Sequence, residues 1–488
     1  MAGEDGMKYA AYSKYKTSPM AWLDKLPTHW SAASLRWMSK RYAGGTPDKG
    51  NEAYWEDGDI PWINSGAVND GYITQPSELI TRVGFANSSA KWIPKDALVM
   101  ALAGQGKTKV MVAQLGIPTT CNQSMAALIP DHLFAPRYLY YWLTANYQNI
   151  RNLAGGEARD GLNLEMLGSI PCPLPPIDEQ QTIARFLDAK TAQIDDLIAK
   201  KRQLIAKLKE KRSALIARTV TRGLPSEVLL RHSRAGGSPD ESDWVPACAG
   251  TTGEVQMKDS GVEWLGTIPS HWATPPLYAR YSVELGKMLS EAKITGEHLI
   301  PYLRNVDVQW NVINYQDLPE MDIPPAEYPR YTIRAGDLLV CEGGEVGRAA
   351  IVGRFDGVIG YQKALHKLRA LRGDEDQRFM CFILEWATQT GVFKAGGMST
   401  IAHLTGEQLR KYRFPKPPKN EQQVIVQYLQ RETNKIGHLQ REVEAVIDRL
   451  TEYRQTLITS AVTGKIDVRK HRHAREGGHP EGLADAMG

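Results

Sequence analysis

The sequence predicts an α+β protein built from two copies of one module. Each copy is an α+β domain followed by a long helix, and the two helices pack on each other. Residues 175–223 return almost intact as residues 417–464. Upstream of them, Trp22-Leu23 returns as Trp264-Leu265, a shift of 242 residues. The same shift relates the helix starts, so each half is a complete module and the chain is a tandem duplication.

Length, charge and cysteine content limit the possible classes of protein. A chain of 488 residues is too long for one core. The net charge of +4 is nearly balanced, and the five cysteines lie far apart. We therefore expect neither a disulfide framework nor a cysteine metal site. No apolar run approaches the roughly 20 residues of a membrane span, and the polar start does not resemble a signal peptide. We expect a cytoplasmic protein without a cofactor.

Both copies of the repeated stretch begin with the same pattern of residues, which is typical of the start of a helix. Pro175-Pro176 and Pro417-Pro418 hold the incoming chain extended, and a Glu-Gln-Gln triplet follows in each copy. Asp178 and Asn420 are suited to cap the first free amides, with a glutamine three residues on to reach back. Both copies therefore predict a helix that begins close to the second proline.

Beyond the caps, apolar residues recur at heptad spacing over forty-odd residues, which gives a rod of roughly 65 Å. Heptad spacing places these residues in an apolar stripe, or seam, along one side of the helix, and a partner helix is needed to bury it. The nearest partner is the helix of the other copy. The alternative is two unrelated helices on two domains. The residues expected to pack are Leu187, Ile194, Leu197, Leu204, Leu208 and Leu215 in the first helix, and Leu429, Ile436, Leu439, Val443, Val446, Leu450 and Leu457 in the second.

Between the repeated markers, the two halves diverge. Residues 31–174 and 273–416 carry short strand-like runs, such as Ala97-Leu98-Val99-Met100, broken by Gly, Pro and Asn turns. Helical stretches follow in both halves. Each segment is expected to fold as a compact α+β domain. Residues 224–256 and 467–488 are rich in turn formers, so we expect a flexible linker and a flexible tail.

A loosened phosphate-loop pattern runs from Ala101 to Thr108. A phosphate loop needs a helix directly after its Lys-Thr pair, whereas residues 109–113 favour a strand. The matching turn of the second half, residues 343–349, lacks the Lys-Thr pair. A glycine-rich β-turn that carries a cation is the better interpretation, and nucleotide hydrolysis through Lys107 and Thr108 stays as the alternative.

Cations and amides near these turns are candidates for DNA contact. Lys and Arg pair with phosphate or with a guanine edge, and Asn and Gln pair with adenine. An ordinary solvated turn is the alternative for each. The DNA-binding candidates are Lys107, Thr108, Lys109, Gln123, Ser124, Arg159, Arg304, Asn305, Arg348, Gln362 and Lys363.

The first long helix is also basic. Between Asp178 and Arg222 it carries eleven Lys or Arg residues against six acids. A solvated face explains such a run as well as contact with DNA phosphates or an acidic partner does. No paired-histidine metal helix and no Gly-x-Ser-x-Gly elbow occurs, so a binding protein fits better than an enzyme. No metal ligands are assigned.

The combination of motifs resembles the DNA-specificity subunit of type I restriction-modification systems. Two divergent domains are each followed by a Pro-Pro-x-x-Glu-Gln-Gln helix, and the run from Trp264 to Trp272 resembles the module start of that family. The resemblance covers nearly the whole chain apart from the linker and tail. It implies a non-catalytic reader whose two helices form an antiparallel coiled coil with pseudo-two-fold symmetry.

The resemblance also implies partners and domain roles. Residues 1–174 and 257–416 are expected to be target-recognition domains, each of which reads one half of a bipartite asymmetric target in double-stranded DNA. The spacer helices, residues 175–223 and 417–466, set the distance between the half-sites. Two methyltransferase subunits dock on the assembly, and restriction and translocase subunits join through the complex. A scaffold that binds no DNA is a further alternative.

Overall fold

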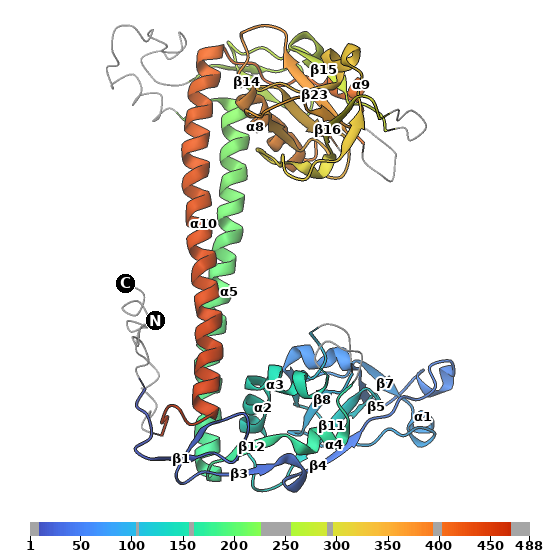
Figure 1. The fold of residues 1–488 in the computed structure, drawn as a ribbon, viewed down its shortest axis with the longest axis vertical. Coiled ribbons are helices and arrows are strands. Elements are labelled where there is room, and N and C mark those ends of the chain that lie inside the picture. Colours follow the sequence, from blue (N-terminus) through green and yellow to red (C-terminus); the bar gives the residue numbers. More distant parts are fainter. Residues whose placement is uncertain are drawn as a thin grey trace. The chain divides into compact units, whose positions relative to one another are not determined.

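The computed structural model describes residues 9–103, 107–155, 161–225, 255–289, 296–393 and 403–469. The chain divides into two compact units, unit 1 with residues 1–201 and 444–488, and unit 2 with residues 202–443. Each unit takes in one α+β domain and part of both long helices, α5 (Ile177–Arg222) and α10 (Lys419–Val462) (Figure 1). Most of the expected linker and tail lies outside the described residues.

The main sheet of unit 1 has five strands. In spatial order they are β4 (Ser39–Ala43), β11 (Met125–Pro130), β8 (Leu98–Ala101), β9 (Val112–Leu115) and β6 (Tyr72–Ile73). Leu98 and Met100 enter one buried cluster, while Val99 and Ala101 enter another. Successive side chains of a strand point to opposite faces, so this short apolar run forms a strand that is covered on both sides. Helix α2 (Pro136–Ala145) packs on β9.

Smaller elements complete unit 1. A three-stranded sheet has the order β10-β5-β7, with β10 parallel to β5. Its strands are β5 (Ile60–Ile63), β7 (Glu78–Ile80) and β10 (Thr120–Cys121). The other strands are β1 (Tyr15–Thr17), β2 (Lys25–Pro27), β3 (Ser31–Ser34) and β12 (Pro171–Leu174), and the other helices are α1 (Arg82–Ala86), α3 (Tyr147–Leu153), α4 (Leu164–Ser169), η1 (Leu35–Trp37), η2 (Glu52–Tyr54) and η3 (Ser65–Asp70).

Unit 2 repeats this topology. Its main sheet has the order β15 (Tyr281–Leu285), β23 (Leu365–Ala370), β20 (Leu338–Cys341) and β21 (Ala349–Ile351), with α8 (Gln377–Gln389) packed on β21. A second sheet pairs β16 (Leu299–Leu303) with β19 (Glu320–Asp322) and, in parallel, with β22 (Gly360–Tyr361). The duplication in the sequence is therefore also a duplication of strand order.

The remaining elements of unit 2 are short. The strands are β13 (Met257–Asp259), β14 (Thr267–Pro269), β17 (Val308–Gln309) and β18 (Val312–Ile313), and the helices are α7 (Tyr328–Tyr331), α9 (Gly406–Lys411), η4 (Leu277–Ala279), η6 (Asn305–Asp307) and η7 (Pro325–Glu327). No helix in the described part of the chain combines the length and the apolar character of a membrane span.

The long helices begin one residue before the expected caps. Because α5 starts at Ile177, Asp178 lies inside the first turn, and the Pro176 carbonyl accepts the amides of Glu179 and Gln180. Helix α10 likewise starts at Lys419, so Asn420 lies inside its first turn. The prediction that Asp178 and Asn420 cap the helices was wrong. The preceding proline already fixes the backbone at the position where the helix begins.

The repeated triplet holds each helix to its own domain. The Glu179 carboxylate accepts the Trp30 indole N–H at 3.1 Å and contacts His29 Nε2 at 2.8 Å. In unit 2, Glu421 accepts the Trp272 indole N–H at 3.0 Å and contacts His271 Nε2 at 2.8 Å. Both carboxylates are buried. The histidine-tryptophan marker and the triplet therefore recur together because they form one contact.

The glutamine after each glutamate ties the helix start to the preceding loop. Gln180 Nε2 donates to the Pro175 carbonyl at 2.9 Å, and Gln180 Oε1 accepts the Ala135 amide at 2.9 Å. Gln422 donates to the Pro417 carbonyl at 2.9 Å and accepts the Asp376 amide at 2.8 Å. Ala135 and Asp376 directly precede α2 and α8. Gln180 and Gln422 thus align the long helix with the helix that covers the main sheet.

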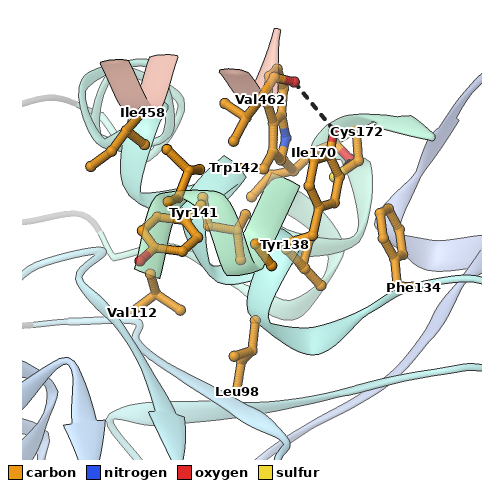
Figure 2. Close-up of a cluster of buried hydrophobic side chains, with 14 of the residues drawn as sticks. Leu98, Val112, Phe134, Tyr138, Tyr141, Trp142, Ile170, Cys172, Ile458 and Val462 are labelled. Carbon is orange, nitrogen blue, oxygen red and sulfur yellow. Dashed lines mark hydrogen bonds between the residues drawn. The ribbon is translucent and has the colours of Figure 1, made fainter. Parts of the chain in front are cut away.

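Within each unit, parts of both long helices share a buried cluster. In unit 1, Leu187 and Ile194 of α5 lie in one cluster with Leu450 and Leu457 of α10. Figure 2 shows Ile458 and Val462 of α10 in the same cluster, beside Tyr138 and Trp142 of α2. In unit 2, Ile216 and Val220 share a cluster with Ile425, Val426 and Leu429.

Burial along the expected seam is uneven. Leu187, Ile194, Leu208, Leu429, Ile436, Val443, Leu450 and Leu457 are buried, and Leu197, Leu215 and Val446 are half-buried. Leu204 and Leu439 remain 37% and 42% exposed. Leu204 follows Leu197, and Leu439 precedes Val446, by seven residues, so all four belong to the heptad position that is less buried than the other.

Candidate nucleic-acid interface

Three loops of unit 1 meet beside the main sheet. The turn after β8 is joined to the turn between β10 and β11, because the Leu102 amide donates to the Ser124 carbonyl at 2.8 Å. The segment before α4 joins them, since the Leu162 amide donates to the Leu102 carbonyl at 2.8 Å. The structure therefore brings Ser124 and Gln123 to the glycine-rich turn that begins at Leu102.

Unit 2 builds the same loop cluster. The Glu342 amide donates to the Ala364 carbonyl at 2.9 Å, and the Leu404 amide donates to the Glu342 carbonyl at 2.8 Å. These bonds join the turn between β20 and β21, the turn between β22 and β23, and the segment before α9. The hydrogen bonds match those of unit 1, although the side chains on the turns differ.

A glycine supports this cluster in both units. Gly44 follows β4, and a Cβ there would clash with the carbonyls of Cys121 and Asn122. Gly286 follows β15, and a Cβ there would clash with the carbonyls of Tyr361 and Gln362. Only glycine lets the backbone approach so closely. Sequence reasoning missed these residues, although the 242-residue shift between them was a signal that could have found them.

The side chains at the tips of the paired turns are accessible. Gln123 and Lys363 are exposed at equivalent positions, and Ser124 and Gln362 are half-buried. The turn backbones are fixed, because Asn122 N donates to the Ile63 carbonyl at 3.1 Å and Gln362 N to the Leu303 carbonyl at 3.0 Å. Gln123 also accepts a hydrogen bond from the Thr46 hydroxyl. A rigid turn with an accessible polar tip is suited to contact base edges.

The residues of the first glycine-rich turn do not share one environment. Lys107 is exposed and its carbonyl accepts the Tyr147 hydroxyl at 2.8 Å, while Thr108 is half-buried. Lys109 is only 4% exposed, and its ammonium donates to the Ala154 carbonyl at 2.8 Å. We do not include Lys109 in the candidate interface, because its charge is used inside the fold. Arg159 lies outside the described residues.

The candidates of unit 2 form hydrogen bonds with their own domain. The Arg348 guanidinium donates to Asn305 Oδ1 at 2.8 Å, and Asn305 Nδ2 donates to the Gly343 carbonyl at 3.1 Å. Arg304 donates to both carboxylate oxygens of Asp307 at 2.8 and 2.9 Å. Burial acts to raise the pKa of Asp307, but the hydrogen bonds and charge of Arg304 outweigh it and hold this pKa below its ordinary value.

Two further features adjoin this network. The Trp310 indole N–H donates to the Glu345 carboxylate at 2.9 Å, which places an aromatic ring beside the glycine-rich turn. Val306 is 65% exposed next to Asn305. No pattern in the sequence singled out Trp310 or Val306. The contact between Trp310 and Glu345 joins segments 35 residues apart, which residue spacing does not reveal.

The structure does not form a phosphate loop after Lys107 and Thr108. The described chain enters strand β9 at Val112, so no helix N-terminus follows the Lys-Thr pair. A phosphate loop depends on those helical amides. Within the described ranges, no group of three or more His, Cys, Asp or Glu side chains is placed to hold a metal ion.

Comparisons with known proteins agree with the repeat. The family model described as the type I restriction modification DNA specificity domain matches twice, at residues 38–208 and 283–448. The Escherichia coli EcoR124I/EcoR124II specificity subunit is 27% identical over 238 residues, which are 48% of this chain and 52% of that protein. The StySPI specificity subunit of Salmonella potsdam is 21% identical over 91% of this chain and 90% of its own length.

Solved structures show a similar fold. A chain from a study of complex assembly and conformational transition of the type I R-M system has a TM-score of 0.64 at 16% identity, covering 90% of this chain and 99% of that chain. The HsdS subunit from Thermoanaerobacter tengcongensis has a TM-score of 0.51 at 16% identity, covering 90% of this chain and 98% of that chain. Since both copies of the module match the family model, this chain belongs to the family of type I restriction-modification DNA specificity domain proteins.

Proposed function

We propose that each domain reads one half of a bipartite, asymmetric DNA target through its loop cluster. The observation that carries this proposal is that the two clusters share hydrogen bonds and burial but differ in side chains. Gln123-Ser124 occupies the turn in unit 1, where unit 2 has Lys363-Ala364. A common scaffold with different tips is suited to two different sequences on one duplex.

The chemistry of the tips suggests the contacts. A glutamine reads adenine by paired hydrogen bonds, and a lysine donates to the O6 and N7 atoms of guanine or to a phosphate. Lys107, Thr108, Gln123 and Ser124 are the candidates in unit 1. Gln362 and Lys363 are those of unit 2, with Arg304, Asn305 and Arg348 behind them to hold the loops in place.

The two long helices are proposed to pair as an antiparallel coiled coil that fixes the distance between the half-sites. The shared clusters in each unit support this pairing, and Arg454 of α10 binds Asp195 of α5 at 2.9 Å. Residues 175–223 and 417–466 then act as spacers, between the readers at 1–174 and 257–416. A rigid spacer leaves a gap of fixed length in which no sequence is required.

In this proposal the chain itself performs no catalysis. Two methyltransferase subunits dock on the assembly, restriction and translocase subunits join through the complex, and the protein acts on DNA in the cytoplasm. The description of the family, which names DNA specificity, supports the non-catalytic role. Nucleotide hydrolysis is not favoured, since the Lys-Thr pair precedes a strand.

Selection of bound duplexes from a randomised library tests the proposal. The expected product is two short preferred sequences at a fixed separation, with no preference in between. Lys363→Ala should relax one half-site and Gln123→Ala the other, whereas the exposed control Lys258→Ala should change neither. A single continuous preferred sequence would refute the bipartite reading, and equal affinity for all duplexes would favour a scaffold that binds no specific DNA.

A further inference from the structure

The half of α5 that lies in unit 2 carries an unusual charge. Residues 202–222 contain seven Lys or Arg residues and a single acid, Glu210. The part of α10 that lies in unit 1, residues 444–462, contains two Arg residues and three acids. The excess of positive charge is therefore local to one segment of one helix.

Four of these cations form a line on the helix surface, which we call the basic stripe. Lys207, Lys211, Arg218 and Arg222 follow one another at intervals of four, seven and four residues. These intervals return to nearly the same face of an α-helix, and they correspond to rises of about 6, 10 and 6 Å. All four side chains are exposed. The basic stripe therefore extends for about 22 Å along the helix.

The basic stripe makes no ion pair within the described residues. By contrast, Arg212 on the same helix pairs with the buried Glu385 of α8, and Lys200 pairs with Asp196 at 2.8 Å. Arg212 is thus committed to the fold through a buried carboxylate, whereas Lys200 makes an exposed pair within its own helix. The cations of the basic stripe leave their charge available to a partner.

The repeat supplies an internal comparison. The 242-residue shift maps the basic stripe onto Arg449, Tyr453, Ser460 and Gly464. Only the first of these residues is charged, and Ser460 is buried. Since the second copy forms a long helix without the other three cations, the charges of the basic stripe are not a requirement of helix formation or packing.

We propose that the basic stripe binds the phosphate backbone of DNA, separately from the loops that read bases. The proposal rests on the proposed function, because it assumes that the chain engages a duplex. Lysines act on phosphates as point charges, and arginines can bind them through two N–H groups. A separation of about 6 Å along the helix is in the range of neighbouring phosphate groups on one strand.

The neighbours of the basic stripe favour a phosphate backbone over an acidic protein. Gln203, Ala214 and Thr221 lie along one edge of the stripe, three or four residues from its members. Of the large apolar side chains at the same spacing, Leu208 is buried, Leu215 is half-buried, and Leu204 is 37% exposed. Protein interfaces depend on buried aromatic or aliphatic anchors. Contacts to DNA backbone depend mainly on charge and do not need them.

The salt dependence of DNA binding tests the proposal. We would measure the full-length chain against a 40-base-pair duplex of random sequence by fluorescence anisotropy between 50 and 200 mM salt. The variant Lys207→Gln/Lys211→Gln/Arg218→Gln/Arg222→Gln should lower the slope of log affinity against log salt by about 3.6, at about 0.9 for each phosphate contact. The loss of affinity over this salt range should then be about a hundredfold smaller than for the unaltered chain.

A matched control removes the same charge elsewhere on the two long helices. Arg202→Gln/Lys209→Gln/Arg441→Gln/Arg449→Gln also removes four exposed cations and should change the slope by less than about 1. An unchanged slope in the stripe variant, or an equal change in the control, would overturn the proposal while leaving target reading by the loops intact. Failure of the unaltered chain to bind DNA, both alone and in the assembled complex, would overturn the proposed function as well. Loss of an acidic protein partner with an unchanged slope would identify the basic stripe as a protein-binding surface.

Discussion

Removal of the Glu421 side chain should destabilise unit 2 strongly. Its carboxylate is 5% exposed, accepts the Trp272 indole N–H and contacts His271. Glu421→Ala leaves a buried N–H without its acceptor and removes a hydrogen-bonded charge. A buried N–H donor left without its acceptor costs about 1–3 kcal/mol. We therefore expect the free energy of unfolding to fall by about that amount.

Urea denaturation followed by tryptophan fluorescence measures this change, because Trp272 is part of the contact. The matched control is Glu442→Ala on the same helix, where the carboxylate is 57% exposed and contacts His438 one turn away. The control should change stability by less than about 0.5 kcal/mol. If Glu421→Ala costs less than about 1 kcal/mol, as for an exposed pair, the contact does not hold the helix to the domain and the reasoning is refuted.

Three further predictions concern charge, packing and backbone. Burial raises the pKa of Glu421 against the opposing effects of His271 and Trp272. The protonated carboxyl therefore adds stability at pH values below the unfolded-state pKa, and this stability is lost as the pH rises through the folded-state pKa. Urea denaturation from pH 4 to 7 should show the unaltered chain losing stability relative to Glu421→Gln. Leu457→Ala should lower the free energy of unfolding by about 2–5 kcal/mol, because this side chain is 1% exposed. Leu439→Ala should lower it by less than about 1 kcal/mol, because that side chain is 42% exposed. Thermal or urea unfolding of both variants checks the difference. Gly286→Ala should disturb the loop cluster and weaken DNA binding, whereas Gly353→Ala, with no atom near the added Cβ, should not; binding of both to the selected duplex distinguishes them.

The helix starts show how far local sequence rules extend. Two prolines and the following polar residues predicted where the long helices begin to within one residue of Ile177 and Lys419. The capping pattern assigned to Asp178 and Asn420 was wrong. The triplet that follows is repeated for tertiary reasons, because Gln180 binds the loop before α2 and not the first turn of its own helix. Capping rules describe only neighbours in the sequence.

The candidate interface also has features that the sequence predicted and features that depend on tertiary contacts. Sequence comparison of the halves located the polar turns at Gln123 and Lys363, and the structure places them at equivalent positions. The burial of Lys109 was not predictable, because its ammonium meets a carbonyl 45 residues further along the chain. Whether an accessible cation contacts DNA or serves the fold depends on such distant partners.

The sequence by itself determined the duplication, the two long helices and the family, because heptad spacing and a constant 242-residue shift are properties of the order of residues alone. Only the tertiary structure decided which polar residues are committed to the fold. Glu179 and Glu421 are both held by a tryptophan and a histidine about 150 residues away. Lys207 and Arg218 are exposed and make no ion pair among the described residues. The physical reason is that burial and pairing depend on segments brought together from far apart, and the free energy of a charged side chain changes with those neighbours.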